Sequence, residues 1–238
     1  MAGWRDAAIA GVLGAVVGAA AVMVAHHTGA GEDKAAIGRI VHDYVLDHPE
    51  ILPEAMHRLE ERRSAKLVVE HRKAIERPFG GAWAGAPDGD VTLVEFTDFA
   101  CGFCRATLPA VTKLLAEDPK LKVIYREIPI LSPASTAAAK VALAAGNAER
   151  YGVFRRNLYA AGPPTAENIA AAAASAAIDP NAGNGAAISA EIDNNLALAR
   201  ALGIGGTPSF VIGDRMISGA VGYDALKEAV DAARKNRG

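Results

Sequence analysis

The chain has 238 residues, of which 51% are hydrophobic, and its formal net charge is −2. This length accommodates one medium-sized domain and an appendage, with ample apolar material for a core. Because charges of both signs are spread along the chain, the composition argues against a partner such as nucleic acid or another polyanion. The chain contains only two cysteines, so its fold does not depend on structural disulfides.

The first feature in chain order is an uncharged apolar run at residues 7–25. Its length approaches the roughly 20 residues that a helix needs to cross a bilayer, and Arg5 weakly places the N-terminus in the cytoplasm. The run also fits a secretory signal with small residues for cleavage at 19–21. We favour an uncleaved anchor, because the apolar run continues beyond that site. Residues 1–33 are therefore predicted to be a signal anchor or a signal peptide, and either one exports the remainder.

Residues 34–77 predict a small helical appendage made of two amphipathic helices. The residue before Pro49 avoids the helical region of backbone space, so the first helix ends there and the second runs to Ile75. Two such helices cannot bury their apolar faces alone, so they must pack on the main domain or on another copy of the chain. Residues 77–90 are rich in Gly and Pro, which predicts a linker. We therefore favour a homo-oligomer over docking on the main domain.

The next stretch, residues 91–109, contains both cysteines and organises the rest of the chain. Val91 to Phe99 is rich in β-branched and aromatic residues, which predicts a buried strand, and apolar residues then recur at helical spacing. Cys101 and Cys104 therefore lie where a strand ends and a helix begins. The unpaired N–H groups and the dipole of a helix N-terminus favour a thiolate, which is the nucleophile in disulfide exchange. We predict that Cys101 attacks and that Cys104 resolves the mixed disulfide.

A Cys-x-x-Cys pair can also be half of a zinc site, which needs two further Cys or His ligands. The chain has no third cysteine, and its last histidine is His71. We therefore predict no metal centre and no cofactor. The lack of histidine after residue 71 also argues against Cys–His or Ser–His–Asp catalysis in this part of the chain.

Beyond the motif, the pattern predicts alternating elements that form a sheet covered by helices, an α/β fold. Ser132 and Pro133 suit the N-cap and first position of a helix, and Gly213-Asp214 is a two-residue hairpin turn. The predicted elements are a strand at 121–128, helices at 133–147, 149–160, 165–178 and 188–202, a hairpin at 209–218 and a helix at 223–235. The Ala-rich helices form a helical insertion at about 133–202.

Three stretches, residues 94–104, 125–130 and 206–211, resemble thioredoxin-fold disulfide oxidoreductases of the DsbA type and occur in that family's order. The resemblance implies that residues 78–238 are a thioredoxin-like catalytic domain whose helical insertion caps the active site. It also implies that Pro208 is cis and that Thr207 faces Cys101 across the substrate groove.

The resemblance further implies that Glu95 is a buried acid that accepts the proton of Cys104, and that Gly102 and Phe103 contact the substrate. In addition, residues 44–52 resemble the N-terminal region of ScsC-type proteins, which can assemble through these helices. This second resemblance strengthens the expectation of self-association.

The function that follows is that of an exported thiol-disulfide oxidoreductase, anchored on the periplasmic side of the inner membrane through residues 7–25. Its expected partners are exported cysteine-containing clients and a membrane redox partner. Gly102-Phe103 lacks the histidine found between the cysteines of strong DsbA-type oxidants, and a positive group there would raise the reduction potential. We therefore favour isomerase or reductase activity over oxidase activity. The alternative is a binding module, either a redox-inactive holdase or a carrier of Cu(I), which soft thiolates suit.

Overall fold

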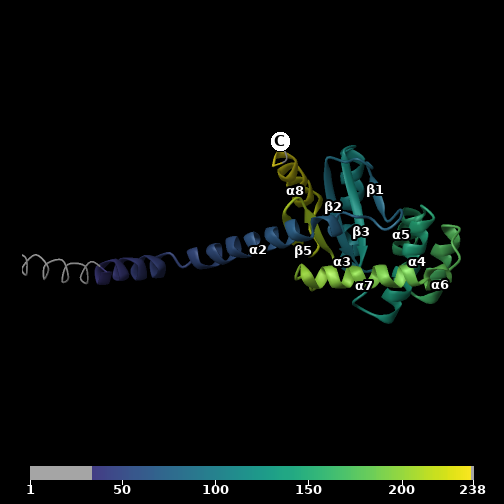
Figure 1. Ribbon diagram of the computed structural model, residues 1–238, viewed down its shortest axis with the longest axis horizontal. Coiled ribbons are helices and arrows are strands. Elements are labelled where there is room, and N and C mark those ends of the chain that lie inside the picture. The colour runs from purple at the N-terminus through teal and green to yellow at the C-terminus, as the bar shows by residue number, and fades with distance from the viewer. Residues whose placement is uncertain (1–33, 237–238) are drawn as a thin grey trace, which may run out of the picture. The chain divides into compact units, whose positions relative to one another are not determined.

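The computed structural model describes residues 34–236 (Figure 1). The chain divides into two compact units, residues 1–59 and 60–238. None of the helices in the described range is long and apolar enough to cross a membrane. The predicted signal or anchor at residues 1–33, with its bilayer contact through 7–25, lies outside the described residues.

The described part of the first unit is helical and exposes its apolar side chains. Residues 34–47 are helical, the chain turns at 48–50 as the proline there predicts, and α2 (Ile51–Ile75) then begins. The exposed apolar residues, each between 48% and 71% accessible, are Ile37, Ile40, Val41, Tyr44, Leu46, Leu52, Met56 and Leu59. Within the described part of this unit, no core covers these side chains.

A mixed sheet of five strands, in the order β1-β3-β2-β4-β5, forms the centre of the second unit. The strands are β1 (Trp83–Gly85), β2 (Val91–Thr97), β3 (Leu121–Glu127), β4 (Ser209–Ile212) and β5 (Arg215–Ser218). β2 and β3 are parallel, and the other neighbouring pairs are antiparallel. A parallel pair needs a crossover connection, which is α3 (Gly102–Glu117), the helix that begins at the cysteine motif.

Helices cover both faces of this sheet, because alternate residues of its central strands feed two separate apolar clusters. One cluster contains Leu93 and Val123 and includes residues of α3 and of α8 (Tyr223–Lys235). The other contains Val94 and Ile124 and includes residues of α2 and α7. The helical insertion consists of α4 (Pro133–Asn147), α5 (Tyr151–Ala161), α6 (Ala166–Ser175), a short 3-10 turn (Ala182–Asn184) and α7 (Ala186–Ala201). The predicted helices agree with these to within a few residues.

The segment 77–90, predicted as a linker, contains a strand of the sheet. β1 pairs antiparallel with β3 at the sheet edge. Gly85 has a φ of +90°, and a Cβ there would lie 2.2 Å from the carbonyl oxygen of Leu121, so glycine is required. A strand of three residues that ends in glycine is too short to show an alternating pattern, which is why the sequence predicted a linker.

The second compact unit also takes in the C-terminal part of α2, from residue 60 onward. Val68 and Ile75 are each 1% exposed and pack with residues of β2, β3 and α7. Arg126 of β3 donates hydrogen bonds to main-chain carbonyls at the end of α2 and pairs with Glu191 of α7 at 2.7 Å. These contacts hold residues 60–75 on the catalytic unit, although the Gly- and Pro-rich segment follows them.

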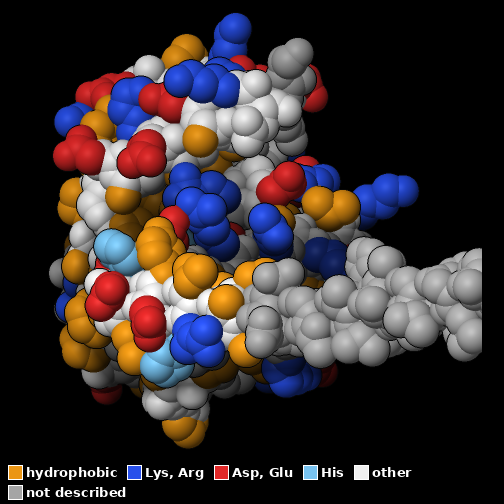
Figure 2. Space-filling view, turned by 90° about the vertical axis from the view of Figure 1, so that its left-hand side faces the viewer, with side chains coloured by type: hydrophobic (Ala, Val, Ile, Leu, Met, Phe, Trp, Pro, Cys, Tyr) orange, Lys and Arg blue, Asp and Glu red, His pale blue; other side chains and the backbone are white. Residues whose placement is uncertain are grey.

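The surface mixes both signs of charge, as expected for a chain with a net charge of −2. On the face shown in Figure 2, Lys and Arg side chains lie among Asp and Glu side chains, with hydrophobic side chains between them.

Candidate active site

The two cysteines lie at the start of α3, at the junction that the sequence predicted. Cys101 is the N-cap, and its Sγ accepts a hydrogen bond from the main-chain N–H of Cys104 at 3.4 Å. Both cysteines are free thiols. Cys101 is 6% exposed and Cys104 is fully buried at 0%. The N-terminal thiol is therefore the one that a substrate sulfur can reach, and it lies where the helix dipole favours a thiolate.

The loop before β4 lies against Cys101. The Thr207–Pro208 peptide bond is cis, as the family resemblance implied. The Cys101 thiol donates a hydrogen bond to the carbonyl oxygen of Thr207 at 3.2 Å, across a separation of 106 residues. The hydroxyl oxygen of Thr207 is buried and has no hydrogen-bond partner among the described residues. The fold thus brings Cys101, Thr207 and Pro208 together.

Gly102 and Phe103 are both exposed, and the Phe103 side chain is 68% accessible. Ile130 and Leu131, in the loop after β3, are also exposed, at 45% and 55%. These two residues line a shallow concave surface together with Pro129, Ser132, Pro133 and Thr136. Exposed apolar residues of this kind are typical of surfaces that contact other polypeptides.

Asp98 connects the cysteine loop to this apolar loop. Its carboxylate accepts hydrogen bonds from the main-chain N–H groups of Ala100 at 2.8 Å, Ile130 at 2.9 Å and Leu131 at 3.0 Å. Its carbonyl oxygen accepts the N–H of Cys101 at 3.0 Å. Asp98 was not among the residues predicted from the sequence, although an acid directly after a buried strand and before the motif was a signal that could have identified it.

Glu95 is fully buried, as the family resemblance implied, but it is not an isolated acid. Arg155 of α5 donates to both of its carboxylate oxygens, at 2.8 and 2.9 Å. The guanidinium also lies over the ring of Tyr125, with 4.3 Å to the centroid. Burial raises the pKa of Glu95, and the charge of Arg155 opposes that rise. Arg155 lies in the helical insertion and was not among the site residues predicted from the sequence.

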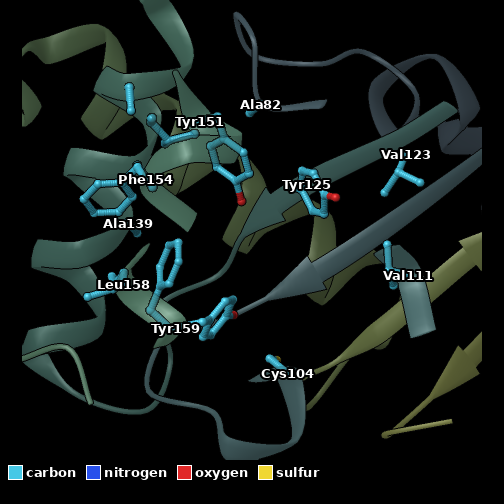
Figure 3. Packing of buried hydrophobic residues seen from close by; sticks show 14 of the residues in the cluster. Ala82, Cys104, Val111, Val123, Tyr125, Ala139, Tyr151, Phe154, Leu158 and Tyr159 are labelled. Carbon is cyan, nitrogen blue, oxygen red and sulfur yellow. The ribbon is translucent and has the colours of Figure 1, made fainter. Parts of the chain in front are cut away.

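α5 presents one polar face to the strands. Tyr151, Arg155 and Tyr159 are spaced four residues apart, so they project from the same side of the helix. The hydroxyl of Tyr159 lies 3.1 Å from the hydroxyl of Thr97, and Tyr151 stacks on Tyr125 with ring centroids 5.1 Å apart. Figure 3 shows Tyr125, Tyr151 and Tyr159 gathered between the helical insertion and the strands.

The two thiols differ in environment. Burial raises the pKa of Cys104 to about 12, the main chain of Asp98 and the hydroxyl of Thr97 oppose this rise, and the negative charge of Glu95 adds to it. Cys104 therefore holds its proton at neutral pH until an acceptor removes it. Among residues 34–236 no group of three or more His, Cys, Asp or Glu residues could hold a metal ion.

Comparison with known protein families gives two matches. The family model described as "Thioredoxin" matches residues 79–232. The model described as "Copper resistance protein ScsC N-terminal domain" matches residues 33–66. The first match spans the sheet, the cysteine motif and the helical insertion, and the second lies on the helical appendage.

Solved structures show the same fold. A thioredoxin-like oxidoreductase from Silicibacter pomeroyi is 37% identical, with 64% of this chain and 91% of that chain covered and a TM-score of 0.62. The thiol-disulfide exchange protein alpha-DsbA2 from Wolbachia pipientis is 29% identical, with 72% and 96% covered and a TM-score of 0.65. Proteus mirabilis ScsC in a transitional conformation is 27% identical, with 85% and 95% covered and a TM-score of 0.65.

The chain spans only 10% of the length of the curated relatives that it matches. These relatives are Na(+)/H(+) antiporters NhaA from two Salinispora species. NhaA 1 of Salinispora arenicola is 35% identical over 65 residues, which is 26% of this chain.

Proposed function

We propose that this chain, which belongs to the thioredoxin family, is a thiol-disulfide oxidoreductase like the DsbA and ScsC proteins among its structural neighbours. Cys101 and Cys104 are its reacting thiols in this proposal. One observation carries this proposal. Cys101 caps α3 beside the cis Thr207–Pro208 bond, while Cys104 is buried behind it. The more accessible thiol thus occupies the position that favours a thiolate, and the second thiol lies within reach of it.

The reaction takes place in two exchange steps. The Cys101 thiolate attacks a client disulfide, so a mixed disulfide forms and one client sulfur leaves as a thiolate. Cys104 then loses its proton and attacks the sulfur of Cys101, which forms the Cys101–Cys104 disulfide and releases the second client sulfur. The client gains two electrons and the enzyme loses them, and the reverse order of steps oxidises a client dithiol. In this proposal, Glu95 accepts the proton of Cys104.

The proposed clients are exported proteins with wrongly paired cysteines, and isomerase or reductase activity is favoured over oxidase activity. Support comes from the neutral Gly102-Phe103 pair between the cysteines, which carries no charge that would raise the potential. The exposed side chains of Phe103, Ile130 and Leu131 supply an apolar surface that suits an unfolded chain. A membrane protein that keeps the thiols reduced completes the proposed cycle.

The proposed domain roles follow the chain. Residues 1–33 direct export to the periplasmic side of the inner membrane, either as an anchor or as a cleaved signal. The helical appendage mediates self-association, which is supported by its exposed apolar side chains and by the ScsC N-terminal match at residues 33–66. Residues from 78 onward carry the catalytic thioredoxin-like fold, with residues 60–75 packed on it.

The test compares two serine variants in native cells. Cys104→Ser cannot resolve a mixed disulfide, so covalent complexes with clients accumulate on acid quenching and non-reducing electrophoresis. Cys101→Ser cannot form them and loses thiol exchange. Retained exchange in Cys101→Ser would contradict the assignment. Retained suppression of client aggregation, or stoichiometric Cu(I) binding by the reduced wild type without any exchange, would instead support the binding-module alternative.

A further inference from the structure

A second fully buried carboxyl group lies beside the residues that surround Cys104. Glu127, at the end of β3, is 0% exposed and pairs in register with Thr97 of the parallel strand β2. Two residues earlier in the same register, Glu95 pairs with Tyr125. Because side chains two residues apart in a strand share a face, both glutamates lie on the face that α5 covers.

The hydrogen bonding of these groups is unequal. The Tyr151 hydroxyl donates to Oε1 of Glu127, whereas Oε2 of Glu127 is buried without a hydrogen-bond partner among the described residues. The Nε atom of Arg155 is also buried without a partner there, while its terminal nitrogen binds both oxygens of Glu95. The hydrogen bonds of this buried guanidinium go to Glu95 and not to Glu127, although its positive charge lowers the pKa of both carboxyl groups.

The charged and titratable groups around Glu127 come from β2, from the loop that follows β2, from β3 and from α5. Burial raises the pKa of Glu127 to about 8, Tyr151 and Arg155 of α5 oppose the rise, and Asp98 and Glu95 add to it. Tyr159 of α5 and Tyr125 of β3 complete the titratable groups of this cluster. On α7 the neutral amide of Asn195 donates to the Glu127 main-chain carbonyl at 3.2 Å.

We propose that the ionisation of Glu127 sets the proton affinity of Glu95, so that Glu95 takes the Cys104 proton more readily once Glu127 is ionised. This inference rests on the proposed exchange reaction. When Glu127 loses its proton, two carboxylates compete for the charge of Arg155 and repel each other, which makes protonation of Glu95 more favourable. Glu127 touches no reacting atom, so it is a positioning residue for the proton.

Atoms and electrons balance in this step. The Cys104 proton moves from sulfur to a carboxylate oxygen of Glu95. The electron pair left on that sulfur forms the bond to the Cys101 sulfur, and the bond from Cys101 to the client sulfur breaks with its pair on the client. Glu127 has exchanged its own proton with solvent beforehand and neither forms nor breaks a bond to sulfur.

The experiment measures how fast Cys104 resolves the mixed disulfide of Cys101 with glutathione, by stopped flow across about pH 6 to 9.5, a window that contains the Glu127 pKa of about 8. The proteins are full-length wild type, Glu127→Gln and Tyr151→Phe. Glutamine mimics the protonated acid, so the ratio of wild-type to Glu127→Gln rates should start near one at low pH. It should rise through pH 8, on the order of tenfold for each unit by which the Glu95 pKa increases. Tyr151→Phe removes a hydrogen bond that lowers the Glu127 pKa, so the same rise should move to higher pH.

A ratio that stays constant over the whole pH range would overturn the inference, because a purely structural role lowers every rate alike. The inference would also be overturned if the rise in the rate occurred at the same pH in Tyr151→Phe as in the wild type. A 13C NMR titration of the glutamate carboxyl carbons supplies a readout without activity, in which a resonance titrating near pH 8 must vanish in Glu127→Gln. If the wild type exchanges with glutathione but the ratio of the two rates does not change with pH, only this inference is wrong. If the wild type does not exchange with glutathione at any pH, the proposed function is wrong.

Discussion

Three buried acids near the cysteines differ in what compensates them. Glu95 has the guanidinium of Arg155, and Asp98 has three main-chain N–H groups. Glu127 accepts one hydrogen bond, from the hydroxyl of Tyr151, and the charge of Arg155 also stabilises its ionised form. Because a buried charge is costly without compensation, burial raises the pKa of Glu127 to about 8 despite these two partners. At the scale of single residues, the protein interior therefore contains a protonated carboxyl group, that of Glu127, near Cys104, the thiol that must lose its proton.

This stored proton makes stability depend on pH in a defined direction. The folded-state pKa of Glu127, about 8, lies above its ordinary value of 4.5. Between these values the folded protein binds more protons than the unfolded chain, so stability falls as pH rises through the window and levels above it. Glu127→Gln has no carboxyl group to titrate at this position, so its folding stability does not show this decrease. Its stability relative to wild type should therefore increase by up to a few kcal/mol between about pH 5 and 8.

Urea unfolding at a series of pH values measures this difference. Asp90→Asn is the matched control, since Asp90 is half-buried at the surface and its pKa is lowered, mainly by its hydrogen bond to Arg234. Because Asp90 titrates below this window, the stability of the control relative to wild type should stay constant across it. Parallel curves for wild type and Glu127→Gln would show that Glu127 titrates alike in both states.

At the scale of elements, the C-terminal part of α2 is held by one buried arginine. Arg126 is 3% exposed, and its guanidinium donates to Glu191, to Asn195 and to the main-chain carbonyls at the end of the helix. The last carbonyls of a helix have no partner within it, and a positive charge there also complements the helix dipole. A single strand residue therefore links β3, α2 and α7.

Arg126→Met should remove this link and leave the buried Glu191 with Arg77 as its only ion-pair partner among the described residues. Arg77 is 68% exposed and lies 3.6 Å away. The expected loss of stability is about 3 kcal/mol, near the lower end for breaking a buried pair. Lys227→Met is the control, because Lys227 pairs with Asp231 on the surface of α8, where both side chains are about half exposed. A surface pair contributes about 0–1 kcal/mol.

Chemical unfolding measures both variants, and hydrogen exchange follows the amides of residues 60–75. Only Arg126→Met should speed exchange there markedly. Equal small effects from the two variants would mean that apolar packing alone holds this part of α2.

At the scale of the whole molecule, two truncations separate the packed part of α2 from the exposed appendage. A chain of residues 60–238 keeps both apolar clusters, whereas a chain of residues 78–238 loses Val68, Ile75 and the carbonyls that bind Arg126. The shorter chain should be less stable by several kcal/mol, since removing one large buried side chain already costs about 2–5 kcal/mol. The longer one should melt close to the full-length protein.

Thermal unfolding by circular dichroism compares the two truncated chains, and sedimentation measures their assembly. Both should be monomeric if the exposed apolar residues of the appendage mediate self-association. An oligomer formed by residues 60–238 would place the interface elsewhere. Equal melting of the two truncations would show that residues 60–77 add nothing to the stability of the domain that begins at residue 78.

Local patterns in the sequence were sufficient for much of the fold. The change from β-branched residues to helical spacing placed Cys101 and Cys104 at a strand–helix junction, and the Gly213-Asp214 turn defined the hairpin of β4 and β5. These signals are local because strand alternation, helix periodicity and turn chemistry involve neighbouring residues only. The family resemblance added the cis Pro208 and the burial of Glu95.

Tertiary structure alone decided which distant residues neutralise the buried acids and which segments pack together. Arg155 reaches Glu95 across 60 residues, and Arg126 reaches the carbonyl of Ile75 in α2 across 51. Nothing in the Ala-rich insertion distinguishes Arg155 from an exposed helix charge until α5 is packed on the strands. Likewise, β1 is a strand only because β3 supplies its hydrogen bonds. Partners of buried charges and of edge strands depend on packing between segments far apart in sequence, which no local pattern records.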